Sequence, residues 1–173
     1  MEFGERRVVD ELSLRVGERE VVGFLGPNGA GKSTTISCIS GLLQPRAGTV
    51  TVCGASVSGQ SEAVRRHLGV VPQQLAIFGQ LNAVTNLRIF AGMYGLTGKK
   101  LADRVAWGLD LAQLTDRADS RVDTLSGGMK RRLNLACSLL HEPQVLICDE
   151  PTTGVDPQSR NHIFEMLKAL RDD

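Results

Sequence analysis

A glycine-rich run, GPNGAGKS at residues 26–33, leaves this chain few possible folds. The run matches the pattern G-x-x-x-x-G-K-[ST], in which backbone N–H groups surround a phosphate. The apolar segment EVVGFL precedes it and TTISCISGLL follows it, so we expect a buried strand leading in and a helix leading out. This order of strand, loop and helix is typical of a phosphate-binding loop in an α/β protein.

The residue types in this loop each suit a phosphate ligand. Glycines let the backbone turn tightly and direct several N–H groups at one point, and the helix that follows adds its positive N-terminal end. We expect Lys32 to reach the β- and γ-phosphates, Ser33 to coordinate Mg²⁺ and Thr34 to bond near the α-phosphate. The expected binding residues of the loop are Gly26, Pro27, Asn28, Gly29, Ala30, Gly31, Lys32, Ser33 and Thr34.

An acidic pair follows a second apolar run, nearer the C-terminus. Val145–Cys148 predicts a short buried strand, and Asp149 and Glu150 come directly after it. The carboxyl end of a central parallel strand lies on the ligand side of such a sheet. We therefore expect Asp149 to hold Mg²⁺ together with Ser33, and Glu150 to polarise a water for attack on the γ-phosphate.

A second glycine turn, LSGGM at 125–129, precedes the helical pattern KRRLNLACSLL. Ser126 is a good N-cap, and we expect the helix to run to Leu140. A helix N-terminus with adjacent glycines can receive an anion, but the same pattern suits a plain capped helix. On local grounds alone the capping interpretation is the better one.

The remaining patterns divide the chain into strand-containing ends and a helical middle. No strand pattern appears between 74 and 123, which predicts a helical insertion within an α/β core. The expected strands lie at 12–16, 20–25, 49–53, 68–72 and 144–148, and the expected helices at 32–43, 61–67, 84–94 and 99–111.

The last helix is marked at its start and along one face. Asp156 is a good N-cap, and Pro157 suits the first helical position. Apolar residues then recur at the spacing of a single helical stripe, at Ile163, Met166, Leu167 and Leu170.

Composition narrows the function classes. The 173 residues suit one domain, and 20 Lys plus Arg against 19 Asp plus Glu give a net charge of +1, which predicts no nucleic-acid partner. Aromatic residues make up only 4%, too few for a base-stacking platform. We expect neither a secretory leader nor a membrane helix. The cysteine spacings match no metal or redox motif, so we expect reduced thiols in a cytosolic protein at Cys38, Cys53, Cys137 and Cys148.

Three motifs together resemble one family. GPNGAGKST, LSGGM and VLICDEP, in this order and at these separations, look like the nucleotide-binding domain of an ABC (ATP-binding cassette) ATPase. The resemblance covers essentially the whole chain. It implies a P-loop NTPase fold in one domain, 1–173, with a RecA-like core at about 1–73 and 141–173, an antiparallel β edge, and a helical subdomain at about 74–140.

The resemblance also implies roles for individual residues, with ATP and Mg²⁺ as cofactors. Phe3 resembles the aromatic residue that stacks on adenine. Gln73 resembles the Q-loop glutamine, which touches Mg²⁺ and the attacking water, and Asp156 resembles the D-loop aspartate. The implied catalytic residues are Glu150, Gln73 and Lys32, and the implied metal ligands are Ser33, Gln73 and Asp149.

In this family two domains pair head to tail, and the pairing gives the second glycine turn a function. Ser126, Gly127 and Gly128 of one domain would bind the γ-phosphate held by the loop of the other. ATP binding would then favour the closed dimer. The implied partners are a second ATP-binding domain, as a homodimer or a related chain, and a transmembrane permease. The implied location is cytoplasmic, at the inner face of the cell membrane.

The sequence departs from the family at two places, of which the segment LNAVTNL at 81–87, near the surface that would contact the partner, is the lesser and the length of the chain the greater. The family carries a switch histidine beyond the final helix, and none of His67, His141 and His162 occupies that position, so we expect a chain truncated at its C-terminus. The leading hypothesis is the ATPase subunit of an exporter-type ABC transporter. An alternative is a nucleotide-binding module with little or no turnover. A third, a soluble ABC ATPase of translation or DNA repair, would carry two cassettes or a coiled-coil insertion.

Overall fold

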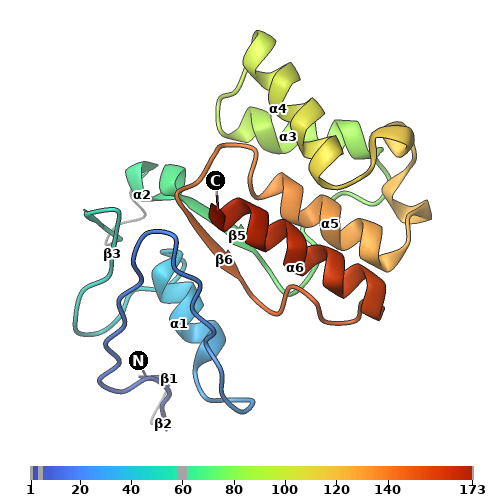
Figure 1. The fold of residues 1–173 in the computed structure, drawn as a ribbon. Coiled ribbons are helices and arrows are strands. Elements are labelled where there is room, and N and C mark those ends of the chain that lie inside the picture. The colour runs from blue at the N-terminus through green and yellow to red at the C-terminus, as the bar shows by residue number, and fades with distance from the viewer. Residues whose placement is uncertain (1, 4–5, 58–61, 173) are drawn as a thin grey trace.

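The computed structural model describes residues 2–3, 6–57 and 62–172 (Figure 1). Among its helices we find none with the length and hydrophobicity that a membrane crossing requires, in the residues described. The elements in chain order are β1 (Glu2–Phe3), β2 (Arg6–Arg7), α1 (Lys32–Ile39), β3 (Thr51–Val52), β4 (Ala55–Ser56), α2 (Glu62–His67), β5 (Leu68–Val71), α3 (Ala83–Met93), α4 (Gly98–Leu111), α5 (Gly127–Cys137), β6 (Val145–Cys148) and α6 (Pro157–Asp172), with single 3₁₀ turns at Thr115–Arg117 and Val122–Thr124.

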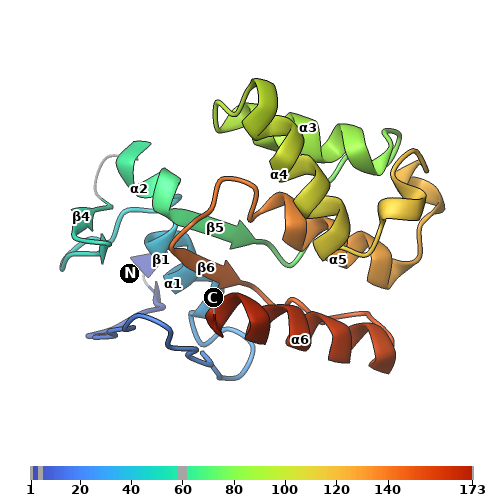
Figure 2. The same cartoon turned by 45° about the horizontal axis from the view of Figure 1, so that its top comes forward.

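The centre of the fold is a parallel pair of strands from distant parts of the chain. β5 pairs with β6 in the register that sets Leu68 opposite Val145 and Val71 opposite Cys148. Figure 2 shows α3 and α4 above these strands and α6 below them. Because the two strands are parallel, both carboxyl ends point the same way, and the residues that follow them meet.

Helices α3, α4 and α5 form a layer with its own apolar core, as the helical pattern of this region predicts. The only bridge of strand type that the structure describes here joins Asn82 to Arg121. Helix α4 packs closely against α3 and the segment after α5 at Gly108, where an added Cβ would lie 3.0 Å from Leu87 and 3.1 Å from Leu140. The fully buried members of this core are Ala83, Leu87, Ala91, Ala112, Leu114, Leu133, Ala136 and Leu140.

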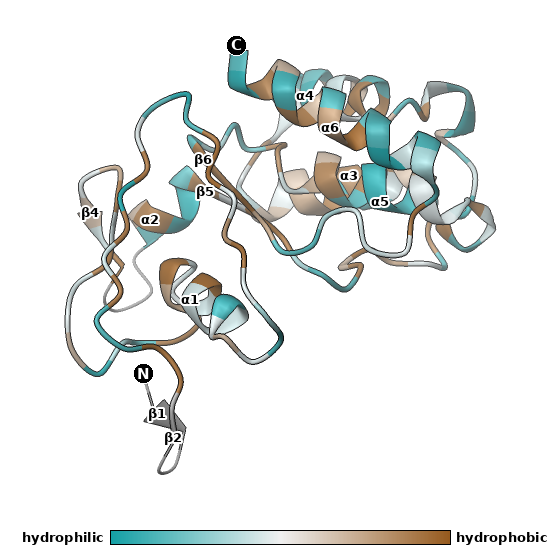
Figure 3. Ribbon diagram, turned by 60° about the horizontal axis from the view of Figure 1, so that its bottom comes forward, coloured by the Kyte–Doolittle hydropathy of each residue, from teal (hydrophilic) through white to brown (hydrophobic). Residues whose placement is uncertain are grey.

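A second core joins the strands to the last helix. Ile163 and Met166 of α6 are buried against Val71, Leu135 and Leu139, and Leu167 and Leu170 pack around them. The predicted stripe is therefore confirmed. In Figure 3 α6 carries both hydrophobic and hydrophilic segments, as expected of a helix with one buried face.

The N-terminal part contains the predicted antiparallel edge. β3 and β4 pair in antiparallel fashion, with Thr51 opposite Ser56 and Val52 opposite Ala55. Val52, Val57, Val64 and Leu68 form a third buried cluster beneath this hairpin. The strand is shorter than the predicted 49–53, because the chain turns back at Cys53 and Gly54, both of which adopt positive φ.

The strands predicted at 12–16 and 20–25 are wrong for this structure, which gives both segments as irregular backbone. A strand needs a neighbour to accept and donate its ladder hydrogen bonds. Within the described residues β5 and β6 pair only with each other, so neither segment finds a partner. Their apolar side chains are exposed, and Leu25 keeps 93% of its surface accessible.

The helices agree with prediction more closely, although two end early. α1 stops at Ile39 rather than at residue 43, because Gly41 adopts a φ of 76° and terminates it. α5 stops at Cys137 rather than at Leu140. The other predicted helix limits lie within a residue or two of those observed.

Candidate active site

The loop before α1 folds as a tight turn that only glycine can make. Gly29 and Gly31 have φ of 82° and 86°, in the left-handed region that glycine enters freely. A Cβ on Gly31 would lie 2.7 Å from the carbonyl oxygen of Val8 and 2.8 Å from Cγ2 of Val9. Gly31 is also the N-cap of α1, so the loop delivers the chain directly into the N-terminus of a helix.

The lysine of the loop folds back over the residues that precede it. Its Nζ donates hydrogen bonds to the carbonyl oxygens of Gly26, at 2.7 Å, and Pro27, at 3.0 Å. Ser33 is exposed in the first turn of α1, next to Lys32. The buried Thr35 hydroxyl donates to the carbonyl of Gly31 at 2.9 Å, which fixes the start of the helix.

The acidic pair lies at the end of β6, as predicted. The backbone N–H of Asp149 donates to the carbonyl of Val71 at 2.9 Å, which extends the strand pairing by one bond. Burial raises the pKa of the Cys148 thiol, immediately before this pair, to about 12. Glu150 adopts a φ of 47°, a backbone conformation that residues other than glycine rarely take, so the chain turns sharply here.

The structure brings Gln73 and Glu150 together across 77 residues of sequence. The Nε2 of Gln73 donates to Oε2 of Glu150 at 2.9 Å. The hydroxyl of Thr153 donates to the same oxygen, also at 2.9 Å. Two donors on one oxygen hold the carboxylate in a single orientation at the carboxyl ends of β5 and β6.

The second glycine turn caps α5 and packs against α6. Oγ of Ser126 accepts from the N–H of Met129 at 3.2 Å, as the capping interpretation predicts. Gly127 faces open space, whereas a Cβ on Gly128 would lie 2.6 Å from Cβ of Ser159. Gly128 therefore allows the N-terminal ends of α5 and α6 to touch.

Asp156 caps α6, also as predicted. Its Oδ1 accepts a hydrogen bond from the N–H of Ser159 at 2.9 Å. This bond, with a second from the Ser159 side chain, lowers the pKa of the Asp156 carboxyl group below its usual value. The charged form is thus favoured at the start of the helix.

The predicted site residues fall into separate groups in this chain. Within the described residues no hydrogen bond or ion pair joins the loop at 26–34 to Asp149, to Glu150 or to the turn at 126–128. Figure 1 shows α1 and α5 apart, with β5 and β6 between them. Phe3 lies in β1, and its side chain falls outside what the structure describes.

One residue near the site escaped prediction from the sequence. Arg131 of α5 is buried, with 5% of its surface exposed, and its guanidinium donates to the backbone carbonyls of Pro72 and Gln73. In the run KRRLNLA its residue type does not distinguish it from its basic neighbours Lys130 and Arg132, which are only partly buried. The available signal was its spacing, three residues after Gly128 and three before the buried Asn134 on one helix face.

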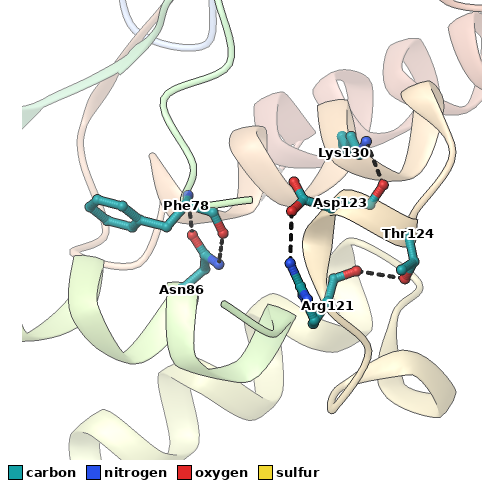
Figure 4. Close-up of polar contacts among 6 residues, drawn as sticks. All are labelled: Phe78, Asn86, Arg121, Asp123, Thr124 and Lys130. Atoms are coloured by element: carbon teal, nitrogen blue, oxygen red, sulfur yellow. Dashed lines mark hydrogen bonds and ion pairs between the residues drawn. The ribbon is translucent and has the colours of Figure 1, made fainter. Parts of the chain in front are cut away.

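A buried amide braces the segment that follows Gln73. Oδ1 of Asn86 accepts from the N–H of Phe78 at 2.7 Å, and its Nδ2 donates to the Phe78 carbonyl at 3.0 Å (Figure 4). The same Nδ2 donates to the carbonyl of Asn82 at 3.0 Å. Asn86 is fully buried and holds this segment against α3.

Further contacts tie this segment to the approach to α5. The N–H of Asp123 donates to the carbonyl of Gly79 at 2.9 Å. Lys130 donates to the carbonyl of Asp123 at 3.0 Å, and Arg121 pairs with the Asp123 carboxylate at 3.2 Å (Figure 4). Thr124 donates to the Arg121 carbonyl at 2.7 Å. Hydrogen bonds thus join the segment after Gln73 to the segment before Ser126, and further bonds fix the latter segment to the start of α5.

The donor set suits a cation that takes most of its ligands from phosphate and water. Among the described residues no three of His, Cys, Asp and Glu gather in the manner of a protein-built metal site. The glycines with positive φ lead directly into the N-terminus of α1, and a glycine turn at a helix N-terminus is an arrangement that fits phosphate. Mg²⁺ in nucleotide sites typically uses one or two protein oxygens, and the hydroxyl of Ser33 and the carboxylate of Asp149 are oxygen ligands of the type that this ion takes.

Comparison with known proteins agrees with this reading of the motifs. The family model described as "ABC transporter" matches residues 9–153. The linearmycin resistance ATP-binding protein LnrL of Bacillus subtilis (strain 168) is 45% identical over 170 residues, which cover 98% of this chain and 55% of that protein. The Nod factor export ATP-binding protein I of Cupriavidus metallidurans (strain ATCC 43123 / DSM 2839 / NBRC 102507 / CH34) is 45% identical over 168 residues, which cover 97% and 55%.

A solved structure supports the same fold. The ATP-binding cassette MJ0796, described as the dimeric structure of a post-hydrolysis state bound to ADP and Pi, matches with a TM-score of 0.80 and 27% identity. The match covers 92% of this chain and 72% of that one. The chain spans about half the length of the curated relatives it matches. The predicted P-loop NTPase fold is confirmed, and the chain belongs to the ABC transporter family, as an ATP-binding domain of that family.

Proposed function

We propose that this chain binds and hydrolyses ATP with Mg²⁺ as the ATPase subunit of an ABC transporter. The observation that carries the proposal is the hydrogen bond between Gln73 and Glu150, at the ends of two parallel strands. A carboxylate and an amide paired in this way would serve, beside a bound γ-phosphate, as the base and the positioning group for the attacking water. The glycine loop before α1 supplies the matching phosphate receptor.

Each residue then has a distinct task. The N–H groups of residues 26–34 would hold the phosphates, and Lys32 would exchange its bonds to two loop carbonyls for bonds to phosphate oxygens. Ser33, Gln73 and Asp149 would hold Mg²⁺, which supplies charge neutralisation between phosphate oxygens. Glu150 would accept the proton of the attacking water while Gln73 orients that water.

The head-to-tail dimer is part of the proposal. Ser126 is the N-cap of α5 and Gly127 and Gly128 begin that helix, which Figure 1 shows apart from α1, so this turn would meet the loop of a second chain. The MJ0796 cassette is dimeric in its ADP and Pi complex, which supports this arrangement. Closure driven by ATP and reopening after hydrolysis would transmit the cycle to a membrane permease at the inner face of the cell membrane.

We further propose that the transporter is an exporter. One relative at 45% identity is named for Nod factor export and another for linearmycin resistance. Both printed functions suit outward movement of a compound. The boundaries proposed for the domain remain a RecA-like core at about 1–73 and 141–173 and a helical subdomain at about 74–140.

Phosphate release from ATP by the purified protein tests the proposal, with Lys32→Ala as the blank. We expect release above the blank, dependent on Mg²⁺, and near-complete loss in Glu150→Gln. Glu150→Gln should retain ATP binding and shift the protein toward dimer in sizing experiments with ATP. Release equal to the blank together with intact ATP binding would support the alternative, a binding module without turnover.

A further inference from the structure

Arg131 carries a buried positive charge whose hydrogen-bond partners are backbone carbonyls. Its Nη1 donates to the carbonyls of Gln73, at 2.8 Å, and Pro72, at 3.2 Å. Its Nη2 makes a longer contact of 3.5 Å with the carbonyl of Thr153. No ion pair to Arg131 occurs among the residues that the structure describes, so its charge is matched by these oxygens alone. A buried guanidinium satisfied only by backbone must hold that backbone in place.

Two of the three carbonyls that accept hydrogen bonds from Arg131 belong to residues whose side chains bind Glu150. Gln73 and Thr153 each donate a side-chain hydrogen bond to Oε2 of Glu150. Arg131 thus bonds to the main chain of both donors, and the side chains of those donors bond to the carboxylate of Glu150. Two chains of hydrogen bonds, one through Gln73 and one through Thr153, therefore connect α5 to the end of β6.

A second side chain of α5 holds the other end of the same loop. Asn134 follows Arg131 by three residues, on the same helix face, and is 2% exposed. Its Oδ1 accepts from the N–H of Ala76 at 2.9 Å, while its buried Nδ2 has no partner within the described structure. Two buried polar side chains of one helix therefore fix residues 72–76 at both ends.

We propose that Arg131 is a positioning residue, which sets the orientation of the Glu150 carboxylate through Gln73 and Thr153. This inference rests on the proposed hydrolysis of ATP. Arg131 reaches neither the loop at 26–34 nor any residue assigned to nucleotide binding there, so it acts on the hydrolytic step and not on nucleotide affinity. Because Arg131 lies on the helix that begins at Ser126, it also ties the second glycine turn to the carboxylate.

Arg131→Met tests the proposal, because methionine keeps the apolar stem and removes every donor. Arg104→Met is the matched control. Arg104 is also partly buried and donates to two backbone carbonyls, those of Leu139 and Leu140, both at 2.9 Å, but it lies away from residues 72–76. Both variants should lose stability, and the melting temperature of each reports that loss.

The kinetic arm separates positioning from stability. We expect Arg131→Met to lower kcat at least tenfold with a change of less than threefold in ATP affinity, and Arg104→Met to leave kcat within twofold of the wild type. In a Gln73→Ala background, Arg131→Met should have a smaller effect than in the wild type, because one of its two routes to Glu150 is already broken and only the route through Thr153 remains. An unchanged kcat in Arg131→Met, or fully additive losses in the double variant, would overturn the proposal.

A second arm does not depend on turnover. Amide hydrogen exchange at residues 73–76 should rise in Arg131→Met and stay at the wild-type level in Arg104→Met. Equal exchange in the two variants would overturn the inference even if the wild type hydrolyses ATP. Phosphate release by the wild type equal to that of Lys32→Ala would instead refute the proposed function, and the exchange result would still decide whether Arg131 holds the loop.

Discussion

Asn86 is the side chain whose loss should be most informative about how residues 73–82 are held. It is fully buried and makes three hydrogen bonds, two to Phe78 and one to Asn82. A net contribution of about 0.5–1.5 kcal/mol for each bond predicts a loss of about 1.5–4.5 kcal/mol in Asn86→Ala. Phe78 is half-exposed, so water can reach part of the freed backbone, and we expect about 2–3 kcal/mol.

Urea denaturation measures this loss directly, as a change in the free energy of unfolding with an unchanged m-value. In thermal unfolding the same loss should lower the melting temperature by about 5–10 °C. Asn161→Ala, at an exposed position of α6, is the control and should change stability by less than about 0.5 kcal/mol. An Asn86→Ala variant as stable as this control would refute the reasoning.

The donor half of the amide can be tested separately with Asn86→Asp. Aspartate keeps the shape and the acceptor for Phe78, but its second oxygen faces the carbonyls of Phe78 and Asn82. A buried carboxylate beside two acceptors should destabilise the protein more than Ala does at pH 7. Burial raises the pKa of such a group, so part of the loss should return between pH 7 and pH 5, as the protonated acid donates one bond.

Three other predictions follow from single residues. Asp156 has a lowered pKa, so its contribution to stability is complete above the pKa of an unfolded aspartate, about 3.9, and is lost as the pH falls through the lower folded value. Asp156→Ala should therefore lower the free energy of unfolding at pH 7. The urea midpoint of this variant should also fall less than that of the wild type between pH 7 and pH 3. Gly31→Ala combines a φ of 86° with a clash at 2.7 Å and should weaken ATP binding more than tenfold by calorimetry, whereas Gly54→Ala, with a φ of 78° and open space around it, should bind normally. Cys148, with a pKa of about 12, should resist iodoacetamide at pH 8 under conditions that label the exposed Cys53, as read by mass spectrometry.

Local signals in the sequence were enough to predict the helices and their caps. Ser126 and Asp156 each cap a helix, as their positions before apolar patterns indicated. The tight turn of the glycine-rich loop was also visible from its own residues, and two of its glycines, Gly29 and Gly31, adopt positive φ. These features depend on interactions within a few residues, which a sequence pattern can represent.

Features that depend on distant partners were harder to predict. The apolar run at 20–25 suits a strand, but strand formation requires a neighbour, and within the described structure it has none. The contact between Gln73 and Glu150 joins residues 77 apart, and although the family resemblance gave both a catalytic role, nothing in the sequence predicted the hydrogen bond between them. Arg131 was missed because a charged residue in a helix is usually solvated, and burial against backbone carbonyls leaves no local pattern.

Because α5 and α6 approach closely at Gly128, the carboxylate of Asp156 lies near the N-termini of both helices. Each helix N-terminus carries about half a positive charge, and two such ends in contact repel each other. Asp156 caps α6 through Ser159, and its Oδ2 lies 3.5 Å from where a Cβ on Gly128, in the first turn of α5, would sit. Its negative charge therefore offsets both dipoles at once. The carboxylate of Asp156 therefore lowers the positive potential that an anion would meet at the N-terminus of α5. An anion should bind there well only where a second group also contributes to holding it.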